Sequence, residues 1–230
     1  MQVVDLTHFL SQGMPVYPGT EGPRFESANT YERDGFQETR MTMYTHTGTH
    51  VDPPAHLFPG GATLDRLPIT QFVGTALVID CTDLREGGRI AMDRVERRRA
   101  DADMAEFLLF RTGWDRYWGD PRYFGDYPCI GDDVAEYLVQ SRKKGVGLDT
   151  IGLDPIAAAA LPLHKKVLAN NAFVIIENLT NLHLVGHSLF TLCALPLKHV
   201  GADGSPIRAI GLIEDRVGEE VLRRAFLNDL

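Results

Sequence analysis

Three histidines and an aspartate lie within "HTGTHVDPPAH", the stretch from residue 46 to residue 56. They are His46, His50, Asp52 and His56. All four positions are even-numbered, and side chains two residues apart point the same way in an extended chain. Gly48, the β-branched residues around it and two consecutive prolines disfavour a helix. We therefore expect an extended segment that places its imidazoles and its carboxylate on one side.

A shared ion requires this segment to bend. In a fully extended chain the α-carbons of His46 and His50 would lie about 13 Å apart, at about 3.3 Å per residue. A bend at Gly48 would shorten that distance, because glycine suits a bulge or a close backbone approach. Two imidazoles and a carboxylate suit Zn, Mn or Fe(II), and three protein ligands leave a position for water, as in catalytic sites. A purely structural ion is the alternative, although structural zinc more often has four Cys or His ligands.

His56 follows the two prolines, which fix the local backbone and would hold its imidazole beside the ion. Histidine titrates near neutral pH, and hydrolysis by a metal-activated water needs a group that moves protons. We therefore assign His56 as a general acid/base rather than as a metal ligand.

The elements that position these residues differ between the two halves of the chain. The first 70 residues are rich in Gly, Pro and Thr, which predicts short strands and long loops. Later apolar runs predict buried strands within 75–82, 106–114, 146–150 and 172–179, and two further strands within 188–197 and 207–214. Helices are predicted over 92–100, 131–145, 156–171 with a break at Pro162, and 217–227. In the second of these, Lys143 and Lys144 would form the last turn and Gly145 would end it. The pattern predicts a mixed α/β fold.

Charge and composition argue against several classes of protein. The net charge of −8 without a Lys/Arg block argues against nucleic acid or an anionic membrane as a partner and favours a small-molecule substrate. Three scattered cysteines form no disulfide framework, and no apolar run could span a bilayer. The start, "MQVVDLTHFL", lacks the features of a signal peptide, so a cytoplasmic protein is expected. No repeat or linker divides the chain, which predicts one domain over 1–230.

The histidine-rich segment resembles the H-x-G-T-H-x-D-x-P-x-H signature of the cyclase-like metal-dependent hydrolases, which include bacterial kynurenine formamidases and isatin hydrolases. The stretches "DLTHFLSQGMPVYPG", "FRTGWD", "VIIENLTNL" and "PLKHVGADGSPIRA" are similar to other parts of that family. The resemblance covers most of the chain. It implies a swivelling β/β/α domain with a mixed β-sheet core, usually assembled as a homodimer or homotetramer.

The resemblance also implies roles for particular residues. His46, His50 and Asp52 would bind a divalent metal, Zn or Mn, and Asp52 would bridge to a second ion. His56 would shuttle protons. Glu177 and a downstream histidine, His164, would complete a two-metal site, so that one or two ions bind per chain.

Two departures from the family affect these expectations. The step from His164 to Glu177 is thirteen residues, one longer than in the family. An extra residue in the "ANN" turn would leave His164 in the site, whereas one in the helix would rotate it away and leave one ion. Formamidases carry a Trp and a nearby acid where this chain has Tyr17 and Thr20. Tyr17 would still offer an aromatic wall for a planar substrate.

The resulting hypothesis is a metal-dependent amidohydrolase that acts on a small aromatic amide, with N-formylkynurenine as the best single substrate. Ring opening of a cyclic amide or lactone, as in isatin hydrolases, is the first alternative. A metal-dependent binding protein without turnover is the second, and the intact His56 argues against it.

Other chemical signals are weaker. His183 and His187 form a second H-x-x-x-H, but no carboxylate follows at the spacing of a metal motif. We expect no metal role for them. Trp114 and Trp118 are expected to lie in the core or at an interface rather than against the substrate.

Overall fold

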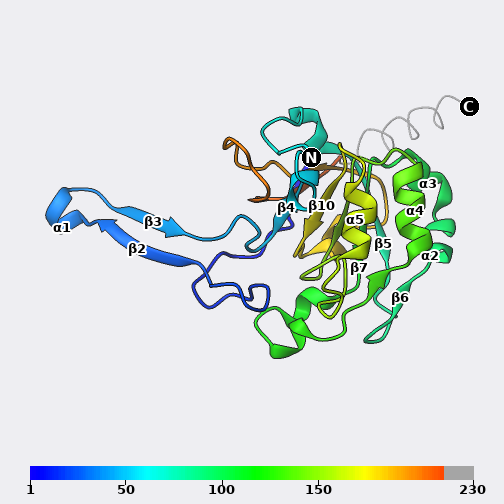
Figure 1. Cartoon of the computed structure of the whole chain (residues 1–230), viewed down its shortest axis with the longest axis horizontal. Coiled ribbons are helices and arrows are strands. Elements are labelled where there is room, and N and C mark those ends of the chain that lie inside the picture. Colours follow the sequence, from blue (N-terminus) through cyan, green and yellow to red (C-terminus); the bar gives the residue numbers. More distant parts are fainter. Residues whose placement is uncertain (215–230) are drawn as a thin grey trace, which may run out of the picture.

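The structure, a computed structural model, describes residues 1–214, so the helix predicted over 217–227 lies outside the described residues. Its centre is a mixed, curled sheet (Figure 1). In spatial order the sheet contains β1 (Gln2–Asp5), β13 (Ile210–Ile213), β11 (Phe190–Cys193), β5 (Val73–Asp80), β7 (Phe107–Arg111), β9 (Gly145–Leu148), β10 (Val174–Glu177), β4 (His50–Asp52) and β12 (Ser205–Pro206).

The four strands β5, β7, β9 and β10 are parallel to one another, and the remaining pairs in this sheet are antiparallel. Each of the six ranges predicted to hold a strand overlaps one strand of this sheet. The mixed α/β fold predicted from the sequence is therefore confirmed.

Strand β7 shows how the sheet separates two apolar clusters. Leu108 and Phe110 belong to the cluster under the helices, whereas Phe107 and Leu109 belong to the cluster on the other face. Because alternate residues of a strand face opposite sides, a strand buried on both faces is apolar at every position. The covering helices are α2 (Met92–Glu96), α3 (Arg99–Met104), α4 (Asp132–Gln140) and α5 (Pro162–Leu168).

A two-stranded ribbon projects from the sheet (Figure 1). It consists of β2 (Arg24–Asn29) and β3 (Glu38–Thr42), joined through the short helix α1 (Tyr31–Asp34). Every residue of β3 is exposed. The other small elements are the parallel pair β6 (Arg89–Ile90) and β8 (Cys129–Ile130), and the 3-10 turns η1 (Pro54–His56), η2 (Ile69–Phe72), η3 (Trp114–Tyr117), η4 (Pro121–Phe124) and η5 (Leu182–Val185).

Three helix predictions were wrong at their boundaries. Helix α4 ends at Gln140, because the buried Lys143 donates hydrogen bonds to the carbonyls of Ala102 and Ala105 instead of continuing the helix, and Gly145 opens β9. The range 92–100 is divided into α2 and α3. In 156–171 only α5 is helical; it begins at Pro162, whose fixed φ and missing N–H suit a first helical position.

Within residues 1–214, no helix is both long enough and apolar enough to cross a bilayer.

Candidate metal centre

Strands β4 and β10 place three of the predicted site residues on one face of the sheet. His50 lies directly opposite Glu177 in this antiparallel pair, and Asp52 follows His50 by two residues on the same face. Val51 and Ile176 point to the other face, where they join an apolar cluster. His50 and Asp52, separated by the apolar Val51, therefore place their side chains on one face of an otherwise apolar sheet.

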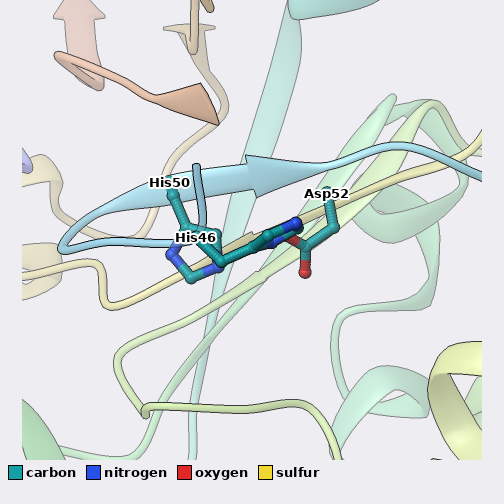
Figure 2. A group of neighbouring side chains, drawn as sticks. All are labelled: His46, His50 and Asp52. Carbon is teal, nitrogen blue, oxygen red and sulfur yellow. The ribbon is translucent and has the colours of Figure 1, made fainter. Parts of the chain in front are cut away.

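His46 approaches from the loop before β4, and Figure 2 shows its imidazole gathered with that of His50 beside the Asp52 carboxylate. His46 Nδ1 lies 2.6 Å from Asp52 Oδ1, and His50 Nε2 lies 3.2 Å from the same oxygen. The chain turns at Gly48, whose φ of +67° costs glycine no steric strain. The bend required for a shared ion is present at the residue where it was expected.

A second group of ligating side chains shares Asp52. His164 Nε2 lies 3.0 Å from Glu177 Oε1 and 4.0 Å from Asp52 Oδ2. His164 occupies the first turn of α5, and that helix ends at Leu168. The thirteen-residue step to Glu177 therefore does not rotate His164 away from the site; the connection between helix and strand is a turn that includes the "ANN" residues.

The two groups have the composition of metal sites. One contains His46, His50 and Asp52, the other Asp52, His164 and Glu177, and within each group one ligand atom per residue lies within 4.8 Å of the others. Each offers nitrogen and carboxylate oxygen, the ligands that Zn and Mn accept. The donor set therefore fits one divalent ion in each group, with Asp52 between them.

The charges inside the site favour a cation. Burial lowers the pKa of His50, but Asp52 and Glu177 outweigh it and raise this pKa to about 9. Burial also opposes the rise at His164, where hydrogen bonds to Asp154 and Glu177 raise the pKa to about 10. Burial would raise the pKa of Asp52, but His50 and His46 hold it well below its usual range. Anions that draw protons onto two buried imidazoles also attract metal ions, whose binding would release those protons.

His56 stands beside both groups without belonging to either of them. It ends the 3-10 turn η1, which begins at Pro54, and its ring centroid lies 3.9 Å from that of His46 and 6.4 Å from that of His164. Burial lowers the pKa of His56, with Asp52 opposing the effect and His46 and His164 adding to it. A neutral imidazole in this place can accept a proton.

All seven predicted site residues line one cavity of about 670 Å³. Tyr17, 40% exposed, lies on its wall with Tyr44. The predicted site residues that the cavity brings together are Tyr17, His46, His50, Asp52, His56, His164 and Glu177.

The histidines and tryptophans that were set aside lie elsewhere. His183 and His187 are exposed and belong to neither ligand group. Trp114 is buried, as expected, and the ring of Trp118 stacks on that of His8 with centroids 3.9 Å apart.

Two residues in the site were missed by the sequence analysis. Asn178 Nδ2 donates to the Gly48 carbonyl, which also faces His50 Nδ1 at 2.8 Å. Asn178 has a positive φ of 55°, and its place directly after Glu177 was the available signal. Asp154 faces the outer nitrogen of His164 at 2.7 Å; its only signal was its position shortly after a predicted strand.

Gly204 leaves room for the His46 ring. A Cβ added at Gly204 would lie 2.4 Å from His46 Cε1 and 2.5 Å from its Nε2, and the His46 ring already packs against the His56 ring with centroids 3.9 Å apart. We expect Gly204→Ala to weaken metal binding by about 10- to 100-fold, the range typical of displaced ligand supports. A calorimetric titration with Mn or Zn measures the metal affinity. Gly13→Ala, where a Cβ would meet nothing within 4 Å, is the matched control, and equal affinities in the two variants would contradict the prediction.

Comparison with known proteins identifies the family. The model of the Cyclase family matches residues 4–155 of this chain. A kynurenine formamidase of Geobacillus thermodenitrificans is 32% identical over 208 residues, which are 90% of this chain and 95% of that protein. The chain therefore belongs to the cyclase family, and the resemblance noted in the sequence is confirmed. By this membership the protein is an enzyme, a hydrolase.

Solved structures show the same fold. An isatin hydrolase bound to the product analogue thioisatinate superposes with a TM-score of 0.83 at 25% identity, covering 93% of each chain. A protein of Bacillus stearothermophilus, described as a predicted metal-dependent hydrolase, superposes with a TM-score of 0.71 at 31% identity, covering 91% of this chain and 97% of the other.

Proposed function

We propose that this enzyme is a metal-dependent amidohydrolase that cleaves the C–N bond of a small aromatic amide. The observation that carries the proposal is the position of Asp52. Its carboxylate belongs to both groups of ligating side chains, in a cavity that also contains the free imidazole of His56. A carboxylate shared between two ligand groups is the arrangement that holds a pair of ions for hydrolysis.

Separate residues would bind the metal ions and transfer the proton. His46, His50 and Asp52 would hold one ion, and Asp52, His164 and Glu177 the other. When bound there, divalent metal, Zn or Mn, supplies Lewis acidity that acidifies water and polarises a carbonyl group. His56 accepts the proton of the attacking water and delivers it to the departing nitrogen.

The substrate we propose first is an arylformamide such as N-formylkynurenine, which would give kynurenine and formate. Relatives named kynurenine formamidase match about nine-tenths of the chain at 30–32% identity. The aromatic rings of Tyr17 and Tyr44 on the cavity wall suit a planar substrate.

A cyclic amide or lactone is the second candidate substrate. The likeness to an isatin hydrolase favours it. So does the cavity wall, on which residues 1–214 place no lysine or arginine to bind an anionic group. The same His56 would then protonate the nitrogen of the opened ring.

We also propose that the enzyme works as a homodimer or homotetramer. The exposed ribbon of β2 and β3, which pairs with no other strand of the described chain, supports this. Isolated two-stranded ribbons are marginally stable in water. Sedimentation velocity tests the assembly, and a monomer at micromolar concentration would contradict it.

Metal content and turnover together test the function. The protein is purified without chelator, reloaded with Zn or Mn, and analysed for metal per chain. It is then assayed with N-formylkynurenine, isatin and an aryl lactone. We expect two ions per chain, one for each ligand group, and turnover of the arylformamide. Failure to bind metal after reloading would overturn the mechanism. Metal binding without turnover of any substrate, but with thermal stabilisation by one of them, would favour a binding protein.

A further inference from the structure

Asp154 is a buried carboxylate, 3% exposed, that lies outside both groups of ligating side chains. It accepts three hydrogen bonds from the start of α5. Its Oδ1 accepts from the backbone N–H of Leu163, and its Oδ2 accepts from the backbone N–H of His164 and lies 2.7 Å from His164 Nδ1. One carboxylate therefore contacts both the backbone and the ring of a predicted metal ligand.

The backbone contacts anchor the helix. The first N–H groups of a helix have no partner within it, and a side chain just before the helix usually accepts from them. Here the preceding residue, Leu161, makes no such hydrogen bond, and Pro162 has no N–H. Asp154 takes over this capping role from eight residues before Pro162, and so fixes where the first turn of α5 lies relative to β10.

The ring contact sets the chemistry of His164. An imidazole whose Nδ1 donates to a carboxylate presents the lone pair of Nε2 once that nitrogen is deprotonated. His164 Nε2 is the atom that faces Glu177 and Asp52, at 3.0 and 4.0 Å. The Asp154 contact thus favours the one tautomer that can ligate an ion there.

We propose that Asp154 is a positioning residue that sets the ring orientation and tautomer of His164, and thereby controls loading of the ion shared by Asp52, His164 and Glu177. The inference rests on the proposed metal-dependent function. It goes further by assigning a role to a residue that belongs to neither ligand group.

Asp154→Asn separates this role from simple support of the fold. The side-chain amide can take two orientations. In one its NH2 group points at the backbone N–H of Leu163, and in the other at that of His164, and in both the NH2 group cannot accept the hydrogen bond that a carboxylate oxygen accepts there. In the second case it also faces the ring and favours the tautomer that cannot ligate. We expect the metal-binding step that involves His164 to weaken by about 10- to 100-fold. The step at His46 and His50 should stay within about twofold, because those ligands lie on and before β4, away from α5.

Asp149→Asn is the matched control. Asp149 is 1% exposed and accepts hydrogen bonds from the backbone N–H and the hydroxyl of Thr112 and from the backbone N–H of Gly113. Within residues 1–214 none of its hydrogen bonds involves an imidazole. The Asp149→Asn substitution should lower the melting temperature without changing either metal-binding step.

The experiment is a calorimetric titration of chelator-treated wild type, Asp154→Asn and Asp149→Asn with Mn and with Zn, alongside thermal unfolding of the metal-free proteins. Selective weakening of one step in Asp154→Asn supports the proposal. An unchanged titration, or equal weakening of all steps in proportion to lost stability, overturns it and leaves the metal-dependent function intact. A wild type that binds neither metal overturns the proposed function and this inference with it.

Discussion

Replacement of His56 by alanine is expected to lower kcat by about 10²- to 10⁴-fold, the usual contribution of a general acid/base, while metal content stays at the wild-type level. The reason is its position. The His56 ring packs against that of His46 at 3.9 Å and lines the cavity, but it belongs to neither ligand group. Steady-state kinetics on the best substrate, together with metal analysis of the same preparation, measures both quantities.

His183→Ala is the control for this experiment, because His183 is exposed and lies outside the cavity. It should retain wild-type turnover. If His56→Ala loses metal in parallel with activity, His56 is a ligand rather than a proton carrier. If it retains activity, another group moves the proton.

Replacement of Asp52 by asparagine is expected to reduce metal content from two ions to close to none, because this carboxylate is common to both ligand groups. His46→Ala and His164→Ala should each remove one ion only. Asp52 is 1% exposed and, with Glu177, raises the pKa of the buried His50, so its loss also removes a counter-charge from that imidazole. The free energy of unfolding of the metal-free protein should fall by about 3–5 kcal/mol, as when other buried ion pairs lose one partner.

Elemental analysis tests the predicted loss of metal, and urea denaturation of the metal-free protein tests the predicted loss of stability. Asp203→Asn is a matched control, since Asp203 lies 3.7 Å from His46 Nε2 but is half-exposed and belongs to neither ligand group. Retention of one ion by Asp52→Asn would show that the two groups bind independently of this carboxylate.

The residues of the first ligand group could be predicted because their information is local. The even-numbered spacing from His46 to Asp52 and the glycine between them specify an extended segment with one bend, and strand β4 and Gly48 have that geometry. The central strands could be predicted for a similar reason, since β5 and β7 contain runs of consecutive apolar residues that pack alternately on the two faces of the sheet.

The rest depends on contacts between distant segments. Pro162 favours a helix start at that residue, but whether His164 then reaches the site depends on where the first turn of α5 lies relative to β10, which no local pattern predicts. Asp154 determines it through three contacts across a turn. Likewise, Lys143 was predicted to lie in the last turn of a helix, but its ammonium group is buried against the carbonyls of Ala102 and Ala105. Propensity describes neighbours along the chain and does not anticipate such tertiary partners.

The opposed pair of β4 and β10 has a consequence for how this site tolerates insertions and deletions over evolution. One residue added between His50 and Asp52 would turn a ligand toward the apolar cluster that now holds Val51. One residue added in the turn between Leu168 and Val174 moves no ligand, because His164 and Glu177 are each placed by their own element. Searches for distant relatives should therefore fix the gaps within residues 46–56 and leave the gap after the downstream histidine free to vary.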